Sequence, residues 1–248
     1  MSFNIITGVQ PHKHKTLVYA LAGTGKSTLA SQMDKPLFLD IEGGVNHIDV
    51  PRTPTIGFYM SFIKVINDIH AEATKFLKDY QTIVVDSMDW LVRKAEEHAS
   101  GVRTINRTET GAEIVTDMTA TIGKANDGYG NGYKQLENHI RAEVLPGLQL
   151  LVDDGFAICL IAHADQKDLM DGEGYRTAKI SPAIGERVMH PIVQWCDNVF
   201  YLRNDGGERR LLLEGTPTVL AKNRLGLTGE VSLKDTTIQE ILTPKKGA

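Results

Sequence analysis

The stretch 16–29 constrains this chain more than any other part of the sequence. It reads TLVYALAGTGKSTL, which is an apolar run, a glycine-rich turn, and then Lys26 and Ser27 at the start of an apolar-periodic segment that continues to Met33. Strand, loop and helix in this order are typical of a phosphate-binding loop. Glycines let backbone N–H groups converge on phosphate oxygens, the lysine would reach the β- and γ-phosphates, and the serine hydroxyl would ligate Mg²⁺. We therefore expect ATP to bind along one run of residues, Ala22, Gly23, Thr24, Gly25, Lys26, Ser27 and Thr28.

One position departs from the full phosphate-loop pattern. The pattern has glycine at the position of Ala20, and alanine cannot adopt all of glycine's backbone conformations. We therefore expect a slightly altered turn. An ordinary glycine-rich turn before a helix is the alternative interpretation.

Composition limits the class of protein. The chain has 248 residues and a net charge of −4, so any DNA binding must come from local patches or from assembly. The two cysteines, Cys159 and Cys196, lie in apolar runs without motif spacing, which predicts buried free thiols in a reducing compartment. No signal peptide or membrane-length apolar run is visible, so we expect a cytoplasmic protein without a membrane partner.

Apolar periodicity predicts an α/β fold. Apolar runs indicate buried strands at 17–21, 36–40, 82–86, 156–162 and 196–202. Helical spacing predicts helices over 59–80, 88–99 and from 134 onward, the last broken or kinked at Pro146. This alternation indicates a mostly parallel sheet flanked by helices, and 209–213 with 218–222 predict a C-terminal β-hairpin. We expect a lead-in over 1–15, one domain over 16–230 and a tail over 231–248.

Polar residues follow several of these strands directly. Glu42, Asp86 and His163 each come after an apolar run, and the carboxyl ends of parallel strands meet at one edge, where ligands bind. Asp86 is the candidate for holding the waters of Mg²⁺, and Glu42, rather than Asp40, for activating the attacking water. His163 is the candidate sensor of the γ-phosphate. A helix-capping aspartate, a solvated glutamate and a structural histidine are the alternatives.

Two basic groups lie outside this edge. Lys222 and Arg224 are spaced by one residue on an extended segment, so they point the same way and could clasp a γ-phosphate in the same subunit or in a neighbour. A solvated basic turn is the alternative. The segments 100–133 and 163–185 carry basic residues with interleaved tyrosines, a pattern that suits single-stranded DNA. The candidates are Lys124, Tyr129, Tyr133, Lys134, Lys167, Tyr175, Arg176 and Lys179.

Together these motifs resemble the RecA-like P-loop ATPases. The run LFLDIE at 37–42 resembles the strand that ends in their catalytic glutamate, VVDS at 84–87 their Walker B strand, and LIAH at 160–163 their sensor strand. AKNRLG at 221–226 is similar to the Lys-Asn-Arg-Phe-Gly motif of the RadA branch, with Leu225 in place of the aromatic. In that branch the lysine and arginine act on the neighbouring subunit's nucleotide, a role that the resemblance implies for Lys222 and Arg224.

The resemblance is greatest to phage single-strand annealing recombinases with a RecA core. It implies ATP and Mg²⁺ as cofactors, single-stranded DNA and a single-strand-binding protein as partners, self-association into a ring or filament, and action in the host cytoplasm. A helicase loader or motor ATPase, a small-molecule phosphotransferase, and an ATP-gated binding module with negligible turnover are the alternative functions.

Overall fold

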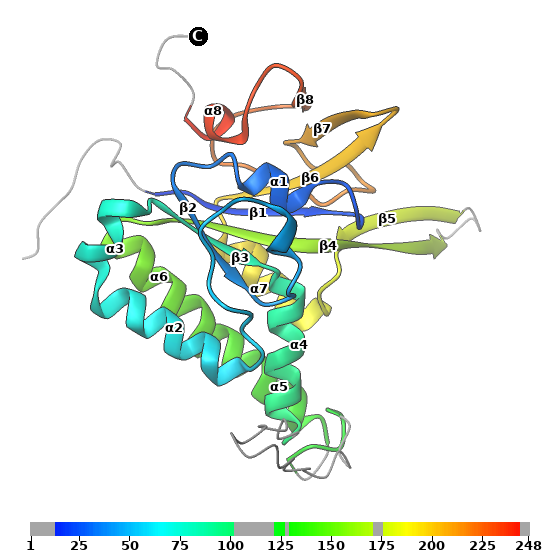
Figure 1. The fold of residues 1–248 in the computed structure, drawn as a ribbon. Helices are drawn as coiled ribbons and strands as arrows, with labels where there is room; N and C mark the ends of the chain where they lie inside the picture. The colour runs from blue at the N-terminus through cyan, green and yellow to red at the C-terminus, as the bar shows by residue number, and fades with distance from the viewer. Residues whose placement is uncertain (1–12, 102–121, 127–128, 171–175, 244–248) are drawn as a thin grey trace, which may run out of the picture.

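The computed structural model describes residues 13–101, 122–126, 129–170 and 176–243, which form a central sheet covered by helices on both faces (Figure 1). The parallel part of the sheet contains, in spatial order, β2 (Pro36–Asp40), β3 (Thr82–Asp86), β4 (Ala157–Met170), β1 (Lys15–Ala20) and β6 (Asn198–Asp205). Two antiparallel strands, β7 (Glu208–Leu212) and β8 (Glu230–Ser232), extend it beyond β6. The predicted fold class, α/β with a mostly parallel sheet, is confirmed.

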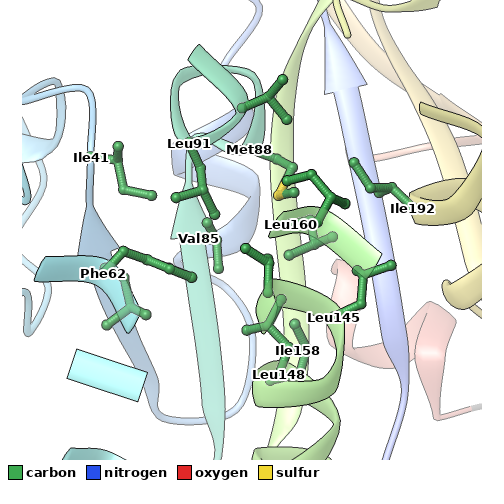
Figure 2. Close-up of a cluster of buried hydrophobic side chains, with 14 of the residues drawn as sticks. Ile41, Phe62, Val85, Met88, Leu91, Leu145, Leu148, Ile158, Leu160 and Ile192 are labelled. Carbon is green, nitrogen blue, oxygen red and sulfur yellow. The ribbon is translucent and has the colours of Figure 1, made fainter. Parts of the chain in front are cut away.

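The larger group of helices covers one face of the sheet. It contains α2 (Tyr59–Ala71), α3 (Ala73–Asp79), α4 (Met88–Ala99), α5 (Asn131–Asn138), the π-helix η2 (His139–Val144), α6 (Leu145–Asp154) and α7 (Glu186–Trp195). Phe62, Leu91 and Leu148 from three of these helices pack on Val85 and Ile158 of the sheet, all fully buried (Figure 2). Full burial of a side chain of this kind contributes about 1.5–3 kcal/mol.

The second face carries the shorter elements α1 (Lys26–Ala30), η1 (Val45–His47) and α8 (Ile238–Leu242). Val84 and Cys159 point to this face, whereas their strand neighbours Val85 and Ile158 point to the other. Because both faces are buried, the strands are continuous apolar runs rather than alternating ones. α8, from the expected C-terminal tail, packs in the same cluster as Leu29.

Most predicted helices form, with local differences. The helix expected over 59–80 is divided at Glu72 into α2 and α3, and the helix after the phosphate loop ends at Ala30 instead of continuing to Met33. Pro146 does mark a break, since it is the second residue of α6, directly after the π-helix. Within the described residues, no helix has the length and apolar character needed to span a bilayer.

The predicted pairing of 209–213 with 218–222 is wrong. β7 instead returns on β6, because Gly206 and Gly207 adopt positive φ angles of 60° and 92° and close a tight turn between Asp205 and Glu208. Glycine is favoured in the two-residue turns of such hairpins. Residues 218–222 make only isolated bridges, from Val219 to β5 and from Lys222 to β6.

The segment after His163 is also a strand where the sequence predicted a loop. β4 continues to Met170, and β5 (Arg176–Pro182) pairs with it antiparallel, so that the two strands project from the sheet as a hairpin (Figure 1). The register places Lys167 directly opposite Lys179. Residues 165–168 of β4 are consecutive polar residues, which removes there the apolar alternation by which strands are predicted.

Candidate functional site

The predicted phosphate-binding loop occupies residues 21–25, between β1 and α1. Gly23 and Gly25 have φ angles of +74° and +95°, a left-handed conformation that side chains rarely adopt. A Cβ at Gly23 would find no heavy atom within 4 Å, so the backbone there is open to a ligand. Ala20, the departure from the motif, is a fully buried strand residue paired with His163, so the turn begins after it.

Lys26, the first residue of α1, is a buried cation beside the loop. Its side chain is buried, and its Nζ lies 3.5 Å from the carbonyl oxygen of Leu21. In the part of the chain that the structure describes, it has no ion pair. Burial lowers the pKa of Lys26, while the charges of nearby Glu42, Asp86 and Asp89 act in the opposite direction. A buried ammonium without an ion pair fits a site whose counter-charge is a bound phosphate.

Ser27 and Asp86 join the loop to the end of β3. The Ser27 Oγ donates a hydrogen bond of 2.6 Å to Asp86 Oδ2. Burial raises the pKa of Asp86, the Ser27 hydrogen bond opposes that rise, and the charges of Glu42 and Asp40 add to it. A hydroxyl and a carboxylate in contact can hold a hydrated Mg²⁺ together with nucleotide phosphates, the usual way that proteins bind this ion. The described residues contain no group of three or more His, Cys, Asp or Glu side chains that could hold a metal ion.

Glu42 and His163 meet beside this pair. Ser87 Oγ donates to Glu42 Oε2 at 3.4 Å, and His163 Nε2 lies 3.9 Å from Glu42 Oε1. Parallel pairing explains the proximity, because Asp40 lies beside Asp86 in the sheet and Ala20 lies beside His163. The structure thus brings together Lys26, Ser27, Glu42, Asp86 and His163, which come from four separate segments of the sequence.

Asp89 is a member of the site that the sequence analysis missed. It is 3% exposed in the first turn of α4, accepts the His163 amide hydrogen at 3.1 Å, and lies 2.9 Å from His163 Nδ1. The imidazole therefore lies with Nδ1 toward Asp89 and Nε2 toward Glu42. A weak signal was available, since an acidic residue three positions after Asp86 follows the same strand.

Asp40 has a structural role. It is 2% exposed, and its Oδ1 accepts the Gly43 amide hydrogen at 2.7 Å. The Thr55 hydroxyl donates to its other oxygen at 3.4 Å. These bonds hold the turn that carries Glu42 away from the end of β2.

Lys222 and Arg224 lie at the other end of the sheet from the phosphate loop. Arg224 pairs at 3.2 Å with the buried Asp197, which also accepts the amide hydrogen of Lys15 at the start of β1. The phosphate loop follows the opposite end of that strand, about 17–20 Å away at ~3.3 Å per residue. Neither cation is therefore near the phosphate loop of its own chain.

The candidate DNA-binding residues fall into two groups. Lys124, Tyr129, Tyr133 and Lys134 are exposed around the start of α5, where the Tyr133 ring contacts the Arg187 guanidinium at 5.4 Å. Lys167 and Lys179 face each other across the β4–β5 hairpin, and Arg176 is the first residue of β5. Tyr175 lies outside the described residues.

Both cysteines are buried free thiols, as predicted from their apolar surroundings. Burial raises the pKa of Cys196 to about 12 and raises that of Cys159 further. Buried thiols with raised pKa values are unreactive, so neither cysteine is a candidate for chemistry at the phosphate-loop edge.

Comparison with known proteins gives a family match over most of the chain. A family model described as an AAA domain matches residues 12–225. The SPbeta prophage-derived uncharacterized protein YorG of Bacillus subtilis (strain 168) is 29% identical over 189 residues, which are 76% of this chain. The chain spans about half the length of that relative (50%). A crystal structure of the RadB recombinase aligns over 89% of this chain and 87% of its own, with a TM-score of 0.46 and 14% identity.

Proposed function

Because this chain belongs to the AAA domain family, we propose that it is a RecA-like ATPase of phage type that binds single-stranded DNA and promotes strand annealing. The single observation that carries the ATPase part is the convergence of Lys26, the Ser27–Asp86 pair and Glu42 around an open glycine loop. Backbone amides of 22–28 and Lys26 would bind the phosphates, and Ser27 with Asp86 would hold Mg²⁺. When bound, the ion supplies charge neutralisation at the phosphates.

Glu42 would orient and deprotonate the attacking water. It is the carboxylate of this edge that is partly exposed (31% for its side chain), whereas Asp86 and Asp89 are buried. A general base needs access to the proton that it takes, which favours Glu42 over its neighbours. His163, oriented by Asp89, would report the γ-phosphate.

The DNA part is supported by the two exposed groups of basic and aromatic residues. The β4–β5 hairpin begins directly after His163, so one strand connects the candidate sensor to the Lys167–Lys179 pair. Tyr129 is 99% exposed and offers a stacking surface for a base. The name of the Bacillus relative refers to a prophage, which supports a phage setting. In that setting the protein would act in the host cytoplasm, with a single-strand-binding protein as a further partner.

Assembly is part of the proposal. Since Lys222 and Arg224 lie far from the phosphate loop of their own chain, they would act on the nucleotide of a neighbouring subunit in a ring or filament. In that arrangement turnover depends on self-association as well as on DNA.

The test combines two measurements on the same preparation. ATP turnover is measured with and without single-stranded DNA, and DNA binding by gel shift at two salt concentrations. Lys26→Ala should abolish nucleotide binding, whereas Glu42→Gln should keep binding and lose turnover. The matched control is Lys35→Ala, a surface lysine outside the site.

Each alternative gives a different result. ATP turnover that does not change with DNA and that consumes a small-molecule phosphate acceptor would indicate a phosphotransferase. Turnover that requires a further protein bound to DNA would indicate a loader or motor. Retained ATP affinity in Lys26→Ala would refute the nucleotide site itself.

A further inference from the structure

The hairpin of β6 and β7 carries three arginines, Arg203, Arg209 and Arg210, and Arg209 lies against the phosphate loop. Arg209, near the start of β7, has its Nη1 only 3.1 Å from the position that a Cβ would occupy on Gly25, with its Cδ at 3.6 Å and its Cζ at 4.0 Å. Since 184 positions separate the two residues, the fold alone brings the guanidinium to this loop. The absence of a side chain at Gly25 is what makes room for it.

The other two arginines of the hairpin form ion pairs on its opposite face. Arg203 and Arg210 lie opposite each other in the β6–β7 register, and both pair with Glu230 of β8, at 2.8 and 2.9 Å. Arg209 points to the other face of the hairpin, because successive side chains of a strand alternate. Leu211, two residues further, packs in the same cluster as Leu29 of α1, which identifies that face.

Arg209 has no acidic partner within the described residues. It is half-buried and makes no ion pair there, whereas Arg203 and Arg210 share Glu230. A guanidinium keeps its charge at every physiological pH and offers five N–H donors. A half-buried cation of this kind, set against a loop that is open for phosphates, has a natural counter-charge in the ligand of that loop.

The side of approach indicates which part of a nucleotide it would contact. β6 and β7 lie on one side of β1, while β4 and β3, which carry His163 and Asp86, lie on the other. The groups assigned to the metal and the attacking water therefore come from the side opposite Arg209. A cation on this side would contact phosphates away from the bond that breaks.

We infer that Arg209 is a nucleotide-binding residue of the same chain, contacting phosphates that ATP and ADP have in common. This inference rests on the proposed function, since it requires a nucleotide in the loop. Binding energy of this kind is equal in the ground state and the transition state, so it changes affinity and leaves the chemical step unaltered.

The experiment measures dissociation constants by displacement of a fluorescent ADP analogue, using ADP, a non-hydrolysable ATP analogue and inorganic pyrophosphate as competitors. Arg209→Ala should weaken all three by a similar factor, about tenfold or more for a charge-assisted phosphate contact. Arg209→Lys should recover part of the affinity. The matched control is Arg210→Ala, the adjacent arginine on the other face.

Specific outcomes would overturn the inference. Unchanged or tighter binding in Arg209→Ala means that the arginine only packs on the loop. A loss for ADP without a loss for pyrophosphate means contact with the nucleoside instead of the phosphates, and an equal loss in Arg210→Ala means a general effect of the hairpin. Wild-type protein that binds none of the competitors would refute the proposed function instead, so the two failures are distinguishable.

Discussion

Replacement of Asp89 by alanine tests the arrangement around His163 most directly. Asp89 is 3% exposed and interacts with both the amide (3.1 Å) and the imidazole Nδ1 (2.9 Å) of His163. Truncation leaves the amide N–H without its partner, at a cost of roughly 1–3 kcal/mol, and removes an imidazole–carboxylate bond of about 1.5–3 kcal/mol. We therefore expect the free energy of unfolding to fall by about 3–5 kcal/mol.

The matched variant Asp89→Asn separates position from charge. Its amide oxygen can still accept the His163 N–H, so we expect a loss of only about 1–2 kcal/mol. Urea unfolding followed by circular dichroism gives both values. Turnover should fall in both variants while nucleotide affinity stays near that of the wild type, since Asp89 acts through His163. An Asp89→Ala protein within 1 kcal/mol of the wild type would refute the reasoning, because the buried bonds could not then be made as described.

The remaining predictions concern charge and burial. Because burial raises the pKa of Asp86 above its ordinary 3.8, its charged form costs stability at neutral pH, and Asp86→Asn should resist urea at least as well as the wild type at pH 7 while losing Mg²⁺-dependent nucleotide binding. That advantage should shrink as the pH falls through the raised pKa and the wild-type carboxyl takes up its proton; an advantage that grows in acid would contradict it. Arg224→Ala should lower ATP turnover in assembled protein but not in protein diluted until it is strictly monomeric. An equal loss of turnover in the monomeric protein would exclude action on a neighbouring subunit. Cys159 and Cys196 should react with a thiol reagent only as the chain unfolds in urea, and fast labelling of native protein would contradict their burial.

The sequence predicted those parts of the fold that depend on continuous burial. The five parallel strands are apolar runs because both faces of the sheet are covered, and their polar end residues converge because parallel strands share one edge. Glu42, Asp86 and His163 could be placed together on that ground alone. The buried stripe of α5, η2 and α6, from Leu136 to Leu151, follows from helical spacing in the same way.

The remaining features of the fold and the site depend on contacts between distant residues, which leave no local pattern in the sequence. Residues 165–168 of β4 are all polar, so this part of the β4–β5 hairpin lacks the alternation that marks a half-buried strand. Asp89 resembles an ordinary acidic residue of a first helical turn, which a helix start favours in any protein. Arg209 approaches Gly25 only through the return of β7 on β6 at the Gly206–Gly207 turn, whereas the sequence pattern predicts a different partner for this strand.

The unbroken course of β4 has a thermodynamic consequence for the proposed activity. The strand pairs with β1 up to His163 and with β5 from Ala164, so it changes partners between two adjacent residues. A ligand that shifts His163 and a ligand that holds the hairpin therefore act on one continuous strand. Coupling between two binding equilibria is reciprocal, so the factor by which ATP changes affinity for a DNA strand must equal the factor by which that strand changes affinity for ATP.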